Sequence, residues 1–358
     1  MNPPFTVVDA SKVLILSALV ALTLSARRAG WLPVVALAAS LASVQPADAG
    51  AICDLFRTDV PHVPRAVFIV SARKAPEVAG CCETVFGRRP AERFTADTRQ
   101  LEVLHRNACG CTRRACWSEL KASIDPSKPT VIFTHGSFIT FDYFQRESPR
   151  TARWLECGAG RAMNVIFFAW PSDGCIPTCA AAVRVRERRA RTYSFYLAEL
   201  LRMLPPHEPG CPVVLASHSH GGEMVCATLH LLGGGAIGQK RLACPPPVQP
   251  RALLFAPAMD ANDLDPGQSF DRALRATPAM AVIYSRKDIA NRLYPLRRFL
   301  ADQSLGKTGF RNSDAAVIGP LAGRVKNLDL TASIGCTHVW SAYLDRPGIA
   351  RSLRSYFR

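Results

Sequence analysis

The sequence predicts an α/β fold in which a mostly parallel central sheet carries helices on both faces. Two observations lead to this prediction: short, continuously apolar runs alternate with helical patterns, and no segment repeats at a fixed period. Strands that are apolar along their whole length are typical of a parallel sheet covered on both faces. The chain has 358 residues, 48% of them hydrophobic, which suffices for one large domain with a sizeable core.

The elements can be placed by residue range. The runs that we expect to form strands are 66–70, 130–136, 164–170, 212–218, 252–258 and 281–285. Helical patterns lie around 140–160, 183–204, 221–233 and 290–303, and a last helix is expected near 341–357. The helix at 183–204 is amphipathic, and we expect Arg184, Arg188 and Arg191 on its solvent face.

Residues 1–49 have the pattern of a targeting segment. An apolar run precedes Arg27 and Arg28, a second apolar run follows them, and Ala47 and Ala49 occupy the small-residue positions of a cleavage site. We therefore expect a bacterial periplasmic or secreted protein. The alternative is a retained inner-membrane anchor facing the periplasm, through which the protein would associate with the membrane.

The rest of the chain divides by composition. Residues 50–127 are rich in Cys, Arg and Pro and are expected to form strands and loops that pack on the core. Residues 128–358 carry the regular alternation of strands and helices and are expected to form the α/β core with the functional site.

Cysteine usage agrees with export. All 13 cysteines lie after residue 50, and so many are typical of a disulfide-bonded protein outside the cytosol. A zinc site on Cys109, Cys111 and Cys116 is disfavoured, because the paired C-x2-C spacing is missing. The count is odd, and Cys226, on the expected buried face of a helix, is the candidate free thiol.

The formal net charge is +16, which could attract nucleic acid, anionic lipid or an acidic glycan. The arginines are scattered, however, and the densest run lies on the helix at 183–204. We interpret that run as a solvated helix face and expect no nucleic-acid partner.

The segment ASHSHGG, residues 216–222, joins an expected strand to an expected helix. A serine at the apex of such a turn is typical of a nucleophile elbow, which needs small residues two positions before and after the serine. Ser217 and Gly221 meet this need around Ser219. We therefore expect Ser219 to be the nucleophile and the backbone N–H of His220 to form half of an oxyanion hole.

A serine nucleophile needs a base, and the base needs an orienting carboxylate. In a fold of this kind the expected chain order is serine, acid, histidine. Asp288 follows the expected strand 281–285, and His338 lies in a loop before the last helix. These residues are therefore the expected acid and base, and Asp260, after strand 252–258, is the alternative acid.

The second half of the oxyanion hole should come from the loop after strand 130–136. Gly136 lets the backbone approach a substrate oxygen, and we expect the N–H of Ser137 or Phe138 to donate. His135 is expected to buttress this loop by hydrogen bonding.

A metal site on His218 and His220 is the alternative reading of the elbow. The two side chains would lie on opposite strand faces or across a sharp turn, and the sequence offers no third ligand nearby. We expect neither a metal nor a cofactor.

Taken together, these segments resemble a bacterial branch of the α/β-hydrolase superfamily, an esterase/lipase-like domain family of unknown function. The segments that carry the resemblance are VFIVSARK (67–74), VIFTHGSFITF (131–141), IFFAWPSDG (166–174), LASHSHGGEMV (215–225), LLFAPAMDAND (253–263), VIYSRKDIA (282–290) and CTHVWSAYLDRPGIARSL (336–353). The resemblance implies an α/β-hydrolase fold with Ser219, Asp288 and His338 as the triad. His220 departs from the family pattern, which has methionine there.

The residues and the resemblance predict an exported serine hydrolase that cleaves a small-molecule or lipid-like carboxylic ester through an acyl-enzyme. Two alternatives remain open. One is a catalytically silent protein of the same fold that binds a partner through its basic surface, and the other is a peptidase or thioesterase that uses the same triad.

Overall fold

The computed structural model describes residues 65–78, 91–173, 180–298 and 301–358. The chain forms two compact units, Met1–Pro61 with Cys175–Val183 and His62–Gly174 with Arg184–Arg358. The first unit lies almost wholly outside the described residues, as does the targeting segment expected at 1–49. The second unit contains the sheet and the site.

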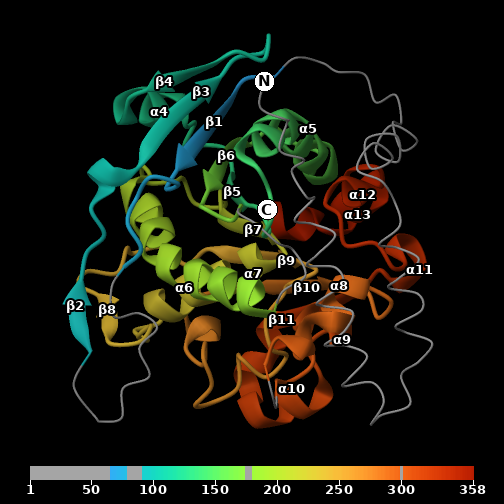
Figure 1. Ribbon diagram of the computed structural model, residues 1–358. Helices are drawn as coiled ribbons and strands as arrows, with labels where there is room; N and C mark the ends of the chain where they lie inside the picture. The colour runs from blue at the N-terminus through green and yellow to red at the C-terminus, as the bar shows by residue number, and fades with distance from the viewer. Residues whose placement is uncertain (1–64, 79–90, 174–179, 299–300) are drawn as a thin grey trace, which may run out of the picture. The chain divides into compact units, whose positions relative to one another are not determined.

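A nine-stranded sheet forms the centre of this unit (Figure 1). Its strands, in spatial order, are β11 (Val325–Asp329), β10 (Met280–Tyr284), β9 (Arg251–Phe255), β7 (Val213–His218), β5 (Thr130–Thr134), β6 (Asn164–Ala169), β1 (Val67–Ser71), β3 (Glu102–Arg106) and β4 (Thr112–Ala115). Every pairing from β11 to β1 is parallel, and β3 and β4 pair antiparallel. The predicted mostly parallel sheet is confirmed.

Residues from both predicted segments, 50–127 and 128–358, build this one sheet. Strands β1, β3 and β4 come from the first segment and continue the sheet beyond β6. A second sheet of two strands pairs β2 (Glu92–Phe94) with β8 (Lys240–Leu242).

The described helices are α4 (Trp117–Ser123), α5 (Phe141–Ala159), α6 (Ala180–Met203), α7 (His220–Leu232), α8 (Ile289–Leu293), α9 (Leu305–Thr308), α10 (Asn312–Ile318), α11 (Thr331–Ile334), α12 (Ser341–Leu344) and α13 (Pro347–Ser352). None of the described helices is long and apolar enough to cross a membrane.

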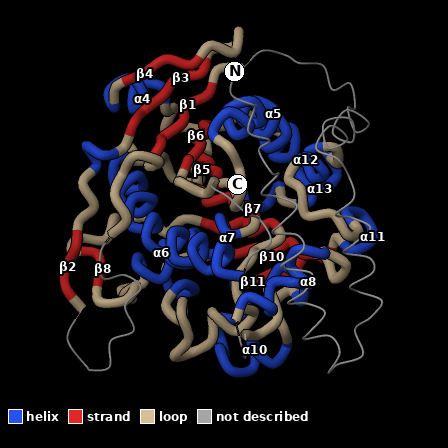
Figure 2. The backbone as a smooth tube through the Cα atoms, viewed as in Figure 1, coloured by secondary structure: helices blue, strands red, loops and turns tan. Residues whose placement is uncertain are grey.

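Alternation along each strand divides the core between the two faces of the sheet. In β5, Ile132 packs into one apolar cluster, whereas Val131 and Phe133 pack into the other, because successive side chains point to opposite faces. Helices α6 and α7 supply the first cluster, and α5, α12 and α13 supply the second (Figures 1 and 2). The sheet is therefore covered on both faces, as predicted.

Two predicted helices are shorter in the structure. The range 290–303 contains α8, which runs on into a 3-10 turn at Tyr294–Arg297, and the described residues of the range after Arg297 are not helical. The range 341–357 is divided into α12, α13 and a final 3-10 turn. Pro347 begins α13, and proline has no N–H with which to continue a preceding helix.

One arginine of α6 does not face solvent as predicted. Arg184 and Arg188 are exposed, but Arg191 is mostly buried and ion-paired to the fully buried Glu223 at 2.7 Å. Glu223 lies on α7, and a buried carboxylate needs a charged partner. The helix pattern alone could not reveal that partner.

The described cysteines are free thiols: Cys109, Cys111, Cys116, Cys157, Cys211, Cys226, Cys244 and Cys336. No disulfide joins any two of these eight, so the predicted disulfides find no support among them. Cys53, Cys81, Cys82, Cys175 and Cys179 lie outside the described residues. Cys226 is fully buried, as expected of a thiol that packs in a helix–sheet core.

Candidate active site

Ser219 stands at a strained turn between β7 and α7. Its backbone has φ 55° and ψ −127°, a conformation that residues other than glycine rarely adopt. Three hydrogen bonds hold it: Ser219 N donates to Phe255 O at 2.9 Å, and Ser219 O accepts from Gly222 N at 2.8 Å and from Ala258 N at 3.2 Å. The predicted elbow therefore exists, and β9 fixes it from the neighbouring strand.

The small residues around Ser219 are required by close backbone approach. A Cβ atom at Gly221 would lie 2.7 Å from the carbonyl oxygen of His135, and one at Gly136 would lie 2.8 Å from the Cβ of Ser219. Such distances are shorter than real Cβ contacts. Glycine at these two positions lets the loop after β5 lie directly against the elbow.

A row of hydrogen bonds links Ser219, His338 and Asp288. His338 Nε2 lies 2.9 Å from Ser219 Oγ, and His338 Nδ1 lies 2.7 Å from Asp288 Oδ2. Since a carboxylate only accepts, Nδ1 carries the proton and Nε2 is free to accept from the hydroxyl. The structure thus brings the three predicted residues together with the geometry of a Ser-His-Asp triad.

Asn291 completes the surroundings of Asp288 and was not predicted. Asp288 is fully buried, and Asn291 donates to it twice, from its backbone N to Oδ1 at 2.9 Å and from Nδ2 to Oδ2 at 3.0 Å. Asp288 is the N-cap of α8. The spacing Asp-x-x-Asn at a helix start was the available signal for this contact.

Asp260, the alternative acid, lies in a different network. Its carboxylate accepts from Arg297 Nη2 at 2.8 Å and is also ion-paired to Arg298. The described residues show no contact between Asp260 and His338. Asp288 is therefore the carboxylate that the structure brings to the histidine.

The loop after β5 presents the backbone that was expected to form an oxyanion hole. Gly136 lies beside Ser219 and is followed by Ser137, whereas the N–H of Phe138 donates to Ser172 O at 3.0 Å. The expectation that Phe138 could be the donor is therefore wrong, since its hydrogen is already bonded. Ser137 on this loop and His220 at the start of α7 remain the candidate donors.

A second layer braces this loop. Phe138 has φ 61°, and the Ser172 carbonyl that accepts its N–H also accepts from Arg186 Nε at 3.2 Å. The guanidinium of Arg186 lies 4.2 Å from the centroid of the Phe138 ring. Ser172 Oγ donates to Ile139 O at 3.2 Å. The Trp-Pro-Ser segment and α6 therefore hold the loop in a conformation that it would not adopt alone.

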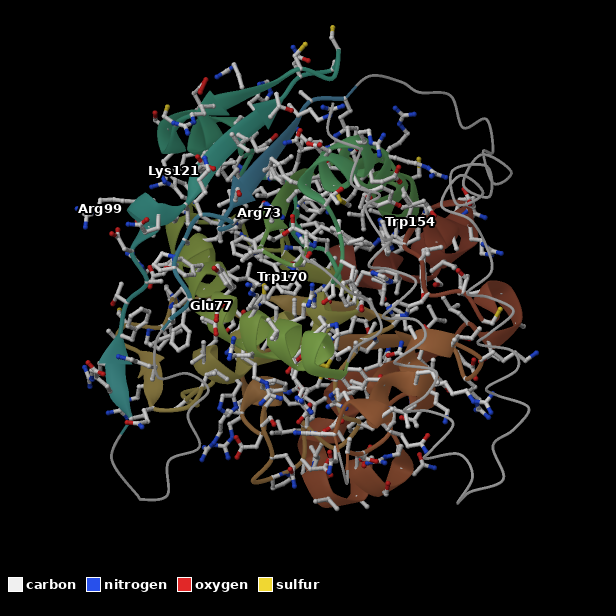
Figure 3. All side chains as sticks on the ribbon, in the orientation of Figure 1. Arg73, Glu77, Arg99, Lys121, Trp154 and Trp170 are labelled. Carbon is white, nitrogen blue, oxygen red and sulfur yellow. The ribbon has the colours of Figure 1, made fainter. Side chains whose placement is uncertain are left out.

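His135 is part of this brace, as predicted from the sequence. Its Nδ1 lies 2.8 Å from Gly136 O, and Trp170 Nε1 donates to His135 O at 2.9 Å. Burial lowers the pKa of His135 to about 4, so the ring is neutral near pH 7. Trp170 lies in the interior, in contrast to surface residues such as Arg99 and Lys121 (Figure 3).

The two other histidines of the elbow have different surroundings. His218 Nε2 lies 2.8 Å from the carbonyl oxygen of His338, a contact that fixes the loop carrying the base and that sequence reasoning missed. His220 is buried with both ring nitrogens lacking a hydrogen-bond partner among the described residues. Burial lowers the pKa of His220 to about 3.

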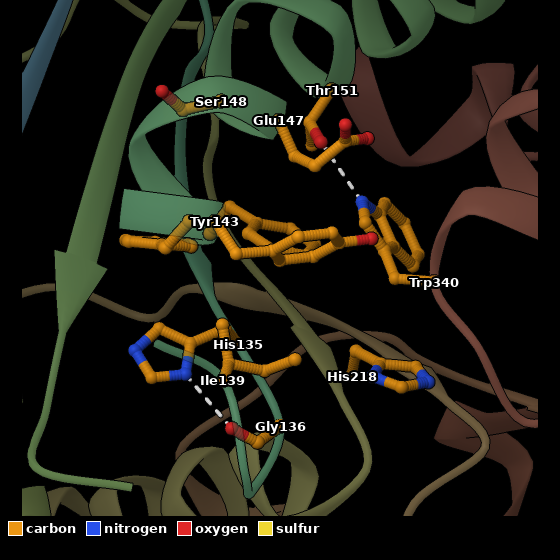
Figure 4. Close-up of a pocket in the computed structure, with 11 residues that line it drawn as sticks. His135, Gly136, Ile139, Tyr143, Glu147, Ser148, Thr151, His218 and Trp340 are labelled. Atoms are coloured by element: carbon orange, nitrogen blue, oxygen red, sulfur yellow. Dashed lines mark hydrogen bonds between the residues drawn. The ribbon is translucent and has the colours of Figure 1, made fainter. Parts of the chain in front are cut away.

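A small cavity adjoins the elbow on the side of His218 (Figure 4). Its walls include Gly136, Ile139, Tyr143 and Trp340, and its space of about 20 Å³ has room for about one water molecule. Trp340 Nε1 donates to Thr151 Oγ1 at 2.8 Å and so fixes one wall. Among the residues described, no group of three or more His, Cys, Asp or Glu side chains is placed to hold a metal ion.

The sheet topology and the elbow at its carboxyl edge define an α/β-hydrolase. Residues 113–300, more than half of the chain, match the family described as alpha/beta hydrolase of unknown function (DUF900). The chain belongs to this family, which confirms the resemblance seen in its sequence. No curated protein matches the chain.

Several solved esterases are similar to the chain at low sequence identity. Esterase B from Lactobacillus rhamnosis is 15% identical, with a TM-score of 0.40, over 89% of this chain and 94% of its own. The catalytic core domain of acetyl xylan esterase from Trichoderma reesei is 13% identical, with a TM-score of 0.33, over 65% and 98% respectively. The hyperthermophilic esterase from the archaeon Pyrobaculum calidifontis is 13% identical, with a TM-score of 0.30, over 71% and 79%.

Proposed function

We propose that this α/β-hydrolase is an exported serine hydrolase that cleaves a carboxylic ester. His338 takes the proton of Ser219 as the hydroxyl oxygen attacks the ester carbonyl, and the tetrahedral intermediate collapses to an acyl-enzyme when His338 gives that proton to the leaving alcohol. Water then attacks the acyl-enzyme with the same histidine as base, which releases the acid and restores Ser219.

The observation that carries this proposal is the row of hydrogen bonds from Ser219 through His338 to the buried Asp288, at 2.9 and 2.7 Å. A serine hydroxyl is a weak nucleophile unless a base accepts its proton, and an imidazole accepts it only in the tautomer that the carboxylate selects. The strained elbow supports the same role, because it lifts Oγ clear of the sheet towards His338.

The developing negative charge on the substrate oxygen would be stabilised by backbone N–H groups of His220 and Ser137. His220 begins α7, so its N–H lies at the positive end of a helix dipole. Gly136 lets the loop after β5, which carries Ser137, lie close to Ser219. No side-chain charge is needed for this step.

Export and the ester class are further parts of the proposal. The N-terminal apolar runs and the Ala-x-Ala pattern at 47–49 support secretion or retention in the periplasm. A peptidase or a thioesterase would use the same triad, and a silent binding protein would not need it. The intact row of hydrogen bonds favours catalysis over the last possibility.

The test compares hydrolysis of p-nitrophenyl esters of increasing chain length with that of matched thioesters and peptide anilides. Ser219→Ala should lower ester turnover at least about a thousandfold, whereas Ser217→Ala, the other serine of the elbow, should retain most of it. If the protein cleaves the thioesters or the peptide anilides faster than the matched esters, its substrate is not a carboxylic ester. If the wild type hydrolyses none of these substrates and forms a salt-sensitive complex with a polyanion, the catalytically silent binding protein is the correct function.

A further inference from the structure

Exposed apolar side chains gather next to the triad. Among the residues described, the strongly exposed large hydrophobic side chains are Ile289 (41%), Leu293 (44%), Leu296 (61%), Val339 (57%) and Val317 (62%). Val317 lies on α10, and the other four follow Asp288 or His338 within eight residues. Such a concentration beside one site differs from the scattered single residues that are normal on protein surfaces.

The four side chains form one stripe. Ile289 follows Asp288 and Val339 follows His338, and the two segments are joined by the 2.7 Å Asp288–His338 contact and by Ile289 N donating to Cys336 O at 3.2 Å. Leu293 and Leu296 follow Ile289 at helical spacing.

The opposite side of the same segment, with Asn291, Tyr294 and Arg297, is buried. The stripe therefore begins beside His338, whose side chain is 23% exposed, and runs along the outer side of α8.

Positive charge surrounds this stripe. Between residues 285 and 298 the exposed charged residues are Arg286, Lys287, Arg292 and Arg298, whereas Asp288 and Arg297 are buried and Arg298 is paired with Asp260. Arg286 is paired with Asp329 at 3.2 Å, whereas Lys287 and Arg292 are exposed and make no ion pair with a described residue. The chain as a whole carries +16.

We propose that this docking face, formed by Ile289, Leu293, Leu296 and Val339 with Lys287 and Arg292, binds an anionic lipid surface. Apolar side chains flanked by exposed cations match such a surface, because the former enter the acyl boundary while the latter meet phosphate groups. The position of the face brings the triad to the lipid. The substrate would then be an ester held at that surface, a consequence that rests on the proposed hydrolase function, whereas the docking itself does not.

The first experiment measures binding without hydrolysis. Full-length Ser219→Ala protein is sedimented with vesicles of phosphatidylcholine alone or of phosphatidylcholine and phosphatidylglycerol in equal parts. We expect binding to the anionic vesicles only, weakening as salt is raised. Leu293→Ser combined with Leu296→Ser should lower that binding roughly tenfold, and Arg292→Glu should lower it by a similar factor. The matched control Val317→Ser, equally exposed on α10, should bind as before.

Two results would overturn the docking face. If the protein with Leu293→Ser and Leu296→Ser binds anionic vesicles as strongly as the protein without them, another part of the chain, such as the apolar N-terminal runs, makes the contact. Equal binding to both kinds of vesicle, or to neither, would remove the charge complementarity on which the proposal depends.

A second experiment separates this proposal from the proposed function. This experiment uses protein that keeps Ser219. Leu293→Ser combined with Leu296→Ser should leave hydrolysis of a dissolved short-chain ester unchanged and lower hydrolysis of an ester embedded in anionic vesicles roughly tenfold. If the wild type hydrolyses neither ester, the proposed function fails, while the sedimentation result still decides the docking face.

Discussion

At the scale of single residues, Asp288 and Asp260 are two buried carboxylates with opposite surroundings. Asp288 meets one imidazole and one amide, whereas Asp260 meets the guanidinium groups of Arg297 and Arg298. The first arrangement orients a histidine, and the second neutralises the buried Arg297 and the exposed Arg298. Chain order alone allowed either acid, because both follow a strand of the sheet.

Substituting each carboxylate by its amide separates these roles. Asp288→Asn should lower kcat by about 10³–10⁴-fold, since the amide no longer selects the Nδ1–H tautomer of His338. Asp260→Asn should leave kcat within a few-fold and lower the free energy of unfolding by up to about 3 kcal/mol, because the buried Arg297 loses the nearer of its two carboxylate partners and keeps only Glu187. Steady-state kinetics and urea unfolding check both, and the reverse pattern would assign the acid to Asp260.

His220 is a buried imidazole, and neither ring nitrogen has a hydrogen-bond partner among the described residues. Its pKa of about 3 in the folded protein lies below the value of about 6.5 expected on unfolding, so between these values only the unfolded chain binds the proton. Titration of His220 therefore does not affect the free energy of unfolding above about pH 6.5, and it lowers that free energy progressively as the pH falls below this value.

We expect His220→Met to raise the free energy of unfolding at pH 8 by about 1–3 kcal/mol, because a buried unpaired polar group is removed. Between pH 8 and pH 5 the wild type should also lose about 2 kcal/mol more than the variant. Urea unfolding at the two pH values measures both effects. An equal loss in the two proteins would show that His220 does not titrate on unfolding.

At the scale of elements, α6 and the segment after β6 shape the site through the loop after β5. Arg186 covers the ring of Phe138 and shares the Ser172 carbonyl with the Phe138 N–H. Phe138 itself has a positive φ. Helix α6 thus holds the residue that follows Ser137 in the loop.

Removing this brace should affect turnover more than substrate binding. Arg186→Met should lower kcat by roughly ten- to a hundredfold with KM changed only a few-fold, because a misplaced N–H is lost mainly in the transition state. Arg188→Met, an exposed arginine of the same helix, is the control and should leave kcat unchanged. Equal effects of the two substitutions, or a change in thermal stability alone, would contradict a positioning role for Arg186.

Sequence patterns predict the central strands of the sheet but not the strands near its edges. The six predicted strands all form, with ends shifted by up to three residues, because strands buried on both faces are continuously apolar. Strands β3, β4 and β11 were not predicted. Their sequences EVLHR, TRRA and VKNLD carry charged residues and are partly exposed near the edges of the sheet, so they lack an apolar pattern.

At the scale of the whole molecule, parallel order explains why the site could be predicted at all. Strands β7 and β10 end at the same edge of the sheet, so Ser219 and Asp288, distant in sequence, had to lie near one another. The supporting residues could not be found in this way. Asn291, His218 and Arg186 act through side-chain contacts that only the packing of helices and loops creates.

Covalent labelling identifies the nucleophile without depending on the choice of substrate. Wild-type protein, Ser217→Ala and Ser219→Ala are treated with a fluorophosphonate, and the adduct is located by peptide mass mapping. We predict one adduct, on Ser219, in the wild type and in Ser217→Ala, and none in Ser219→Ala. An adduct on another residue, or equal labelling of all three proteins, would contradict Ser219 as the nucleophile.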